Sequence, residues 1–87
     1  MFEDDEPVIP NGMAIRRLRR ERGWSRRDFV REIGDASERA SGLRVTLTMS
    51  QLGAIEETSE EVTYRIVCQV ARGLDADPID LVRSGAA

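Results

Sequence analysis

The residues with the clearest chemical character in this sequence are its arginines, whose guanidinium groups suit phosphate binding. Residues 11–31 contain eight arginines against Glu21 and Asp28, so this stretch carries a formal charge of +6, although the whole chain carries −3. The acidic residues gather elsewhere, at 3–6 and at 56–61, where four glutamates occur. A concentrated basic stretch is typical of surfaces that dock on nucleic-acid phosphates.

The sequence lacks the residue types that most catalytic and metal sites need. It has no histidine, and Cys68 is its one cysteine. A zinc site, a Cys/His nucleophile pair and an intramolecular disulfide are therefore excluded. No glycine-rich phosphate loop occurs either. We expect a protein that is not an enzyme, that binds no metal or cofactor, and in which Cys68 is a small buried apolar side chain.

Length and composition predict one small domain. The 87 residues, 40% of them hydrophobic, suit a single core. We expect a helical domain over residues 11–83, an acidic, flexible segment at 1–10 and a flexible tail at 84–87. The apolar stretches are too short to span a bilayer, and the first ten residues are acidic where a signal peptide would be basic. We therefore expect a cytoplasmic protein with no membrane partner.

Hydrophobic periodicity predicts five short helices and an all-α fold. They are expected at 12–22, from Ser25 onward, from Thr48 to 56 or 57, from Thr63 to 74, and at 78–82 after Asp77 and Pro78. Ser25 and Asp28 form a variant capping box, and a proline after Asp77 suits the first position of a helix. The second helix ends either at Gly34 or near Gly42. Residues 43–47 alternate apolar and polar side chains as a short strand does.

Three blocks of sequence resemble the helix-turn-helix domain of the Cro and phage-repressor class, the XRE family. They are residues 15–30, the sequence Leu52-Gly53-Ala54-Ile55-Glu56, and residues 67–74 followed by 77–82. The resemblance covers roughly residues 12–83. It implies a compact five-helix, lambda-repressor-like domain and a DNA-binding transcriptional regulator of the repressor type. Such a domain is expected to bind double-stranded DNA as a homodimer, on half-sites about 34 Å apart.

The resemblance also implies a set of site residues. The helix that starts near Thr48 would enter the major groove and contact bases through Thr48, Met49, Ser50, Gln51 and Ala54. Gln51 suits adenine, and Met49 suits either a thymine methyl group or the core. Independently of the resemblance, phosphate contacts are expected from Ser25, Arg26 and Arg27, which lie at a helix N-terminus, and from Arg39 and Arg44 of the segment between the two helices. In the family, an arginine and a glutamate at the positions of Arg19 and Glu56 form a structural ion pair.

Two departures from the family pattern bear on function. About a dozen residues, 35–47, replace the tight turn between the two helices of the motif. This insertion is either a phosphate clamp or small wing carrying Arg39 and Arg44, or a solvated loop. The loop after the recognition helix is acidic at 57–61, and like charge near phosphates weakens binding.

Other readings of the sequence remain open beside DNA binding. A protein-interaction module on the same scaffold, such as an antitoxin or a phage-encoded adaptor, would grip an acidic protein surface with the arginine-rich face. Acidic residues 3–6 folded over residues 16–27 would inhibit DNA binding. Trp24 is expected in the core. Tyr64 and residues 79–82 belong either to the core or to a dimer surface.

Overall fold

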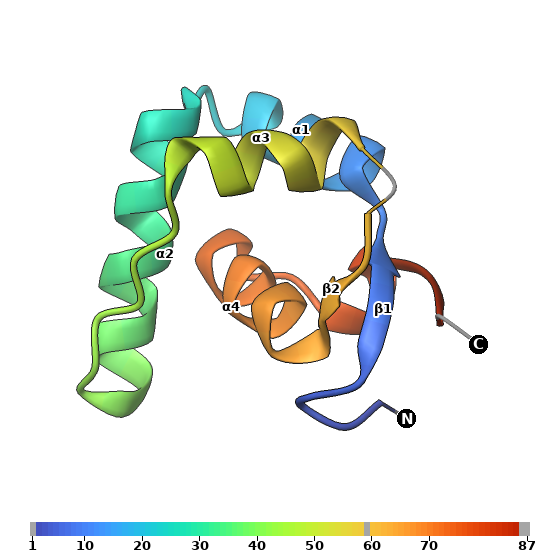
Figure 1. The fold of residues 1–87 in the computed structure, drawn as a ribbon. Helices are drawn as coiled ribbons and strands as arrows, with labels where there is room; N and C mark the ends of the chain where they lie inside the picture. Colours follow the sequence, from blue (N-terminus) through green and yellow to red (C-terminus); the bar gives the residue numbers. More distant parts are fainter. Residues whose placement is uncertain (1, 59, 86–87) are drawn as a thin grey trace.

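The computed structural model describes residues 2–58 and 60–85, which form a mostly helical fold with a small sheet (Figure 1). The described elements are β1 (Pro7–Pro10), α1 (Gly12–Glu21), α2 (Arg26–Ser41), α3 (Met49–Glu57), β2 (Val62–Thr63), α4 (Tyr64–Leu74), a 3₁₀ turn (Pro78–Leu81) and β3 (Val82–Gly85). In Figure 1, α2, α3 and the sheet surround α4. The prediction of a mostly helical fold is therefore confirmed. The prediction of five helices without strands is wrong, because the described residues also form a small sheet.

Side-chain caps fix where α2 begins, as the sequence predicts. The Ser25 hydroxyl accepts a hydrogen bond from the backbone N–H of Asp28 at 3.1 Å, and the Asp28 carboxylate accepts one from the Ser25 N–H at 3.0 Å. Thr48 and Gln51 form the same reciprocal box at the start of α3. Each box satisfies two of the N–H groups that a helix start leaves without a partner.

The second helix passes through Gly34 and ends at Gly42, which resolves the two endings that the sequence left open. Gly42 adopts the left-handed conformation with φ of 78° that a C-terminal cap requires. Gly34 lies buried inside α2, where a Cβ would come within 2.9 Å of the Arg44 guanidinium carbon. The insertion thus begins as extra turns of α2.

The rest of the insertion is an extended segment, residues 43–47, that runs back along α2 toward α3 (Figure 1). The alternation of apolar and polar residues does not make a strand here, because the segment pairs with no strand in the described part of the chain. Its backbone is instead held by a side chain of α2: the Val45 N–H donates to the Ser37 hydroxyl at 2.8 Å. Leu47 is buried, whereas Leu43 is exposed. Residues 43–47 are therefore neither a separate wing nor a plain solvated loop, but a return segment that lies along α2.

Residues 7–10 form the central strand of the sheet, which has the order β2-β1-β3. Val8 is fully buried and pairs with Val62 on one side and Gly85 on the other, both antiparallel. The two prolines are tolerated because Pro7 is the first residue of the strand and Pro10 lies at a break in the β3 register. The prediction of a flexible segment over residues 1–10 is wrong for this strand.

The fifth predicted helix is a single 3₁₀ turn that passes directly into β3. Asp77 caps this turn by accepting a hydrogen bond from the Ile79 N–H at 3.0 Å, as expected for an Asp-Pro start. The chain then pairs with β1 instead of continuing as a helix, and the Asn11 N–H donates to the Leu81 carbonyl at 2.7 Å. Residues 84 and 85, predicted as part of a flexible tail, belong to β3, and 86–87 lie outside the described residues.

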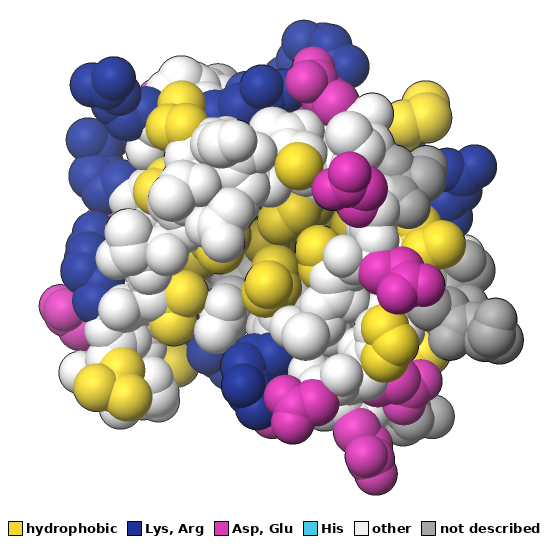
Figure 2. All heavy atoms as spheres, in the orientation of Figure 1, with side chains coloured by type: hydrophobic (Ala, Val, Ile, Leu, Met, Phe, Trp, Pro, Cys, Tyr) yellow, Lys and Arg dark blue, Asp and Glu magenta, His cyan; other side chains and the backbone are white. Residues whose placement is uncertain are grey.

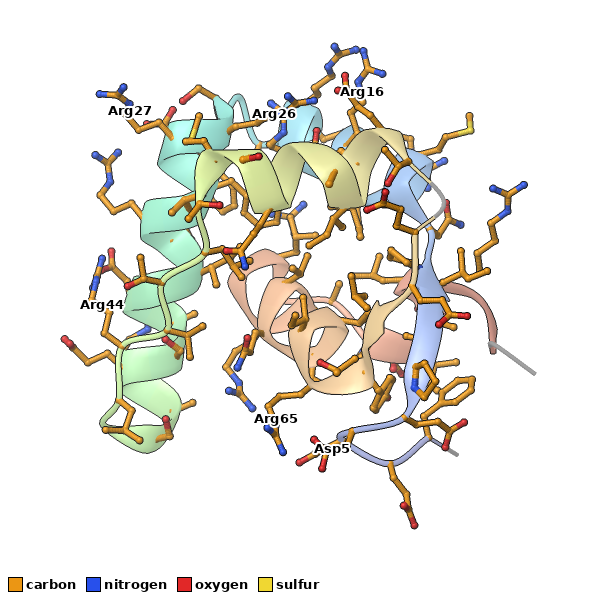
Figure 3. The ribbon with its side chains drawn as sticks, in the orientation of Figure 1. Asp5, Arg16, Arg26, Arg27, Arg44 and Arg65 are labelled. Atoms are coloured by element: carbon orange, nitrogen blue, oxygen red, sulfur yellow. The ribbon has the colours of Figure 1, made fainter. Side chains whose placement is uncertain are left out.

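The acidic residues before β1 contact α4. The carbonyls of Asp4 and Glu6 accept hydrogen bonds from the first backbone N–H groups of α4, those of Arg65 and Tyr64, each at 2.9 Å. Asp5 forms an ion pair with Arg65 at 3.2 Å, visible at the lower end of α4 in Figure 3. These contacts replace the expected side-chain cap from Thr63, which makes none. The acidic segment therefore lies on α4 and not over residues 16–27.

The core gathers around α4 and the middle of α2. Its buried members include Ile15, Phe29, Ile33, Leu52, Ile55, Val67, Val70, Leu74 and Leu81. Trp24 is half-buried and stacks on Phe29, with 5.9 Å between ring centroids. Tyr64 and Leu81 are buried within the domain, whereas Ile79 is exposed. Cys68 is half-buried.

Among the described residues, every helix is too short or too polar to cross a bilayer.

Candidate nucleic-acid interface

The inner side of α3 is fixed to α1 by a buried ion pair between Arg19 and Glu56. The Arg19 Nε lies 2.7 Å from one Glu56 carboxylate oxygen, and its Nη2 lies 2.9 Å from the other. The Glu56 side chain is fully buried. This two-pronged geometry is the strongest arrangement that an arginine makes with a carboxylate. The structure thus brings together the pair that the family resemblance implied.

The same arginine also ties down the turn between α1 and α2. Its Nη1 donates to the carbonyl of Trp24 at 2.8 Å, so one guanidinium holds three parts of the chain. Arg22 lies over the Trp24 ring, 5.8 Å from its centroid, and donates to the Leu74 carbonyl at the end of α4. The start of α2 and the whole of α3 are therefore held in a fixed relation to α1.

The first turn of α3 is open to solvent. Met49 is 45% exposed, and Ser50 is also exposed, so the core alternative for Met49 is wrong. Gly53 and Ala54 continue this outer face one turn later and are partly covered. Ala54 presents only a methyl group on this face, whereas Gly53 is covered by the Arg26 guanidinium. Of the predicted base contacts, Met49 and Ser50 are the two with free, exposed side chains.

Gln51 and Thr48 are occupied by the capping box that begins α3. The Gln51 amide oxygen accepts the Thr48 N–H at 2.8 Å, and the Thr48 hydroxyl accepts the Gln51 N–H at 3.0 Å. A glutamine reads adenine through both atoms of its amide. Reading of adenine by Gln51 would therefore break one hydrogen bond of the box. The spacing of Thr48 and Gln51 is that of a capping box, so the sequence already indicates that capping competes with base contact for the Gln51 side chain.

Arg26 lies across α3, which the sequence did not predict. Its Nε is 3.3 Å from Glu56, its Nη2 is 3.0 Å from Glu57, and its Nη1 would lie 3.2 Å from a Cβ on Gly53. The hydrogen bond to Glu57 is the main cause that raises the pKa of Arg26, with Glu56 adding to it. Arg26, which we expected to bind a phosphate, is thus already paired with two carboxylates of α3.

Arg27 is the predicted phosphate contact whose charge stays available. It is exposed in the first turn of α2 and forms no ion pair with any described residue. Figure 3 shows it pointing away from the protein, on the same edge as Arg16 and Arg26. The Ser25 hydroxyl beside it is used in the α2 cap. Backbone N–H groups of a helix start favour an anion at this position.

The two arginines of the insertion point to acidic neighbours on α2. Arg44 lies 2.6 Å from Asp35, which is the main cause that raises the pKa of Arg44, and it also donates to the Arg31 carbonyl. Arg39 pairs with Glu32 at 3.2 Å. Figure 3 shows Arg44 lying along α2, below the edge that carries Arg27. The prediction of a separate phosphate clamp is therefore not supported by the geometry, because these charges stabilise the insertion itself.

Charge is segregated over the surface. Figure 2 shows basic side chains along the side formed by α2 and the top edge, and acidic side chains mostly on the side of β1 and the start of α4. Glu60 and Glu61 are exposed in the loop after α3, and no ion pair to them occurs within the described residues. A molecule with a net charge of −3 therefore presents a basic edge and an acidic edge on either side of α3.

An apolar hollow of about 170 Å³, which no pattern in the sequence indicates, lies on the other side of α3 from α1. Its lining comes from α3, the loop after it, β2, α4 and Leu47; the residues are Leu47, Gln51, Ala54, Ile55, Glu60, Val62 and Ile66. Figure 2 shows apolar side chains gathered in this depression at the centre of the view. We call it the α3–α4 groove. It forms only when residues 47 to 66 are brought together by the fold.

The described residues contain no group of three or more His, Cys, Asp or Glu side chains placed to hold a metal ion. No protein-family model, curated protein or solved structure matches the chain.

Proposed function

We propose that this protein binds duplex DNA through α3, as a sequence-specific transcriptional regulator of the helix-turn-helix type. The observation that supports this most is the exposed first turn of α3, whose inner side is fixed by the buried Arg19–Glu56 pair. A reading helix must present its N-terminal side chains in one orientation, and this arrangement provides both features.

The exposed side chains suit a small set of base contacts. The Ser50 hydroxyl can donate to or accept from a base edge, and Met49 suits the methyl group of thymine. Arg27, at the start of α2, is placed to bind a backbone phosphate and so to set the register. Recognition on this basis rests on few hydrogen bonds.

The test is selection of bound sequences from random duplex DNA, followed by affinity measurement across a salt series. We expect an enriched sequence motif and a fall of log affinity with log salt of about 0.9 per phosphate contacted. Ser50→Ala should reduce the preference for the selected sequence, whereas Arg27→Ala should weaken all sequences alike and lower the salt slope by about one contact. Arg39→Ala, which removes an arginine paired with Glu32, is the matched control and should change little.

If Ser50→Ala weakens specific and nonspecific binding equally, α3 does not read bases. Absence of binding even at low salt would reject the proposal as a whole.

A second candidate function is a protein-interaction module that uses the arginine-rich face of α1. The observation that favours it is that Arg16 and Arg20 form no ion pair with any described residue. Both arginines lie beside the exposed Met13. An apolar side chain ringed by unpaired charges is typical of a contact surface. This candidate predicts binding to an acidic protein surface that persists in variants unable to bind DNA.

A further inference from the structure

The α3–α4 groove is an open apolar site with room for one side chain. Its floor consists of aliphatic groups, Leu47, Ala54, Ile55, Val62 and Ile66 among them, and its volume is about 170 Å³. Burial of a methionine-sized side chain in such a hollow is favourable by about 25 cal/mol for each Å² of apolar surface removed from water. The groove therefore suits an exposed apolar side chain of a partner.

The edge of this groove is negatively charged. Glu60 is one of its lining residues and Glu61 follows it in the chain. Both carboxylates are exposed, and no basic side chain pairs with them in the described part of the molecule. A partner that fills the groove with an apolar group is thus expected to place positive charge beside it.

The outer face of α1 carries the complementary features. Met13 is 83% exposed, more than any other large apolar side chain among the described residues. It shares a shallow surface hollow with Arg16, Arg17, Arg20 and Glu21. Arg17 is 3.9 Å from Glu21, whereas Arg16 and Arg20 have no ionic partner within the described residues. Met13, with the two unpaired arginines beside it, is therefore an apolar plug. The α3–α4 groove, edged by Glu60 and Glu61, is an apolar socket of opposite charge on the same molecule.

Charge decides how two copies can meet. A symmetric contact of groove on groove would bring the unpaired glutamates of both copies close together. A symmetric contact of α1 on α1 would bring the unpaired arginines of both copies close together. Like charges across an interface oppose association. The contact of one α1 face with the groove of another copy pairs opposite charges and buries Met13.

We propose that the protein associates head to tail, with Met13 of one copy seated in the α3–α4 groove of a second copy. Arg16 and Arg20 then face Glu60 and Glu61 of that copy. The contact is heterologous, so repetition of it yields rings or open chains and not a closed twofold dimer. On DNA it would place successive copies in the same orientation, along direct repeats. The proposal itself does not depend on DNA binding.

Sedimentation velocity of the whole protein, without DNA, tests this contact. We expect concentration-dependent association at low salt that weakens as salt screens the exposed charges. Met13→Glu removes the plug, and the double variant Glu60→Arg, Glu61→Arg reverses the charge of the socket. All three positions are exposed, so both variants should fold like the wild type, which circular dichroism checks. Each variant alone should sediment as a monomer where the wild type associates.

Mixing the two variants gives the sharper result. The double variant keeps a working plug and Met13→Glu keeps a working socket, so the mixture should form a complex of one copy of each and nothing larger. Met49→Glu, which changes an exposed methionine outside the groove, is the matched control and should associate like the wild type. A wild type that stays monomeric at all salt concentrations, a mixture with no complex, or an equal effect of Met49→Glu would overturn the proposal.

Discussion

The buried hydroxyl of Ser37 accepts a hydrogen bond from the backbone N–H of Val45 at 2.8 Å and donates one to the carbonyl of Gly34, also at 2.8 Å. It therefore joins the extra turns of α2 to the segment that returns from them. Arg44 adds a second link by reaching Asp35 and the Arg31 carbonyl. The long connection between α2 and α3 is thus held by side chains in place of a tight turn.

Substitution of Ser37 by alanine should loosen this connection. The Val45 N–H would lose its partner near the protein interior, which costs about 1–3 kcal/mol of the free energy of unfolding. Urea denaturation followed by circular dichroism measures it. Ser41→Ala is the control, because Ser41 is exposed and only donates back to the carbonyl of Ser37. If both variants unfold at the same urea concentration, Ser37 does not hold the return segment.

Neutralising Glu56 should destabilise the fold severely. Glu56→Gln leaves Arg19, a buried arginine, without its carboxylate and also removes one partner of Arg26. Removing one member of a buried ion pair typically lowers stability by about 3–5 kcal/mol. Thermal and urea unfolding measure the change. Glu21→Gln breaks an exposed pair with Arg17 at 3.9 Å and should change stability by less than about 0.5 kcal/mol. A comparable loss in both variants would contradict the structural role of Glu56.

The cap of α2 should make stability depend on pH in the acid range. The Ser25 backbone N–H, followed by its hydroxyl, lowers the pKa of Asp28 below the ordinary value of 3.8. Because the folded pKa is lower than the unfolded one, this contribution is fully present above about pH 5 and is lost as pH falls through the folded pKa. Asp28→Asn should therefore differ most from the wild type above pH 5 and converge with it in acid. A constant difference across this range would show that the charge of Asp28 has no part in the cap.

Release of Arg26 from Glu57 should strengthen DNA binding, if α3 binds DNA as proposed. Glu57→Gln frees the outer side of the Arg26 guanidinium, which can then contact a phosphate. The expected result is tighter binding and a salt slope steeper by about 0.9. Glu60→Gln makes the same change of charge at a residue with no such pair and should steepen the slope less.

The gain from Glu57→Gln should also vanish when Arg26 is replaced by alanine in the same chain. A gain that survives this replacement would assign the effect to overall charge and not to Arg26.

The helices could be predicted from the sequence because their signals are local. Ser25 and Asp28 are three residues apart, and so are Thr48 and Gln51, so each capping box is visible in a short window. The strands could not, because each is short and is defined by partners far along the chain. Val8 pairs with Val62 and Gly85, whereas the acidic composition of residues 1–10 favours a flexible segment.

The candidate site was predictable only in part for a related reason. The positions of Met49 and Ser50 follow from the start of α3, but the pairing of Arg26 depends on Glu56 and Glu57, some thirty residues away in the chain. The helix N-terminus predicts a phosphate contact for Arg26, and the charge of the insertion predicts one for Arg44, but neither signal reveals an internal partner. The α3–α4 groove has no signal in the sequence at all, since its walls come from separate elements.

The central position of β1 sets an order for events during synthesis. Its two neighbours in the sheet lie at residues 62–63 and 82–85, so the strand leaves the ribosome long before either partner exists. The capped helices α1 to α3 can form by then, because their contacts are local and fast. We therefore expect the nascent chain to hold residues 7–10 unpaired until residue 63 has emerged, and the sheet to be complete only after residue 85 has followed.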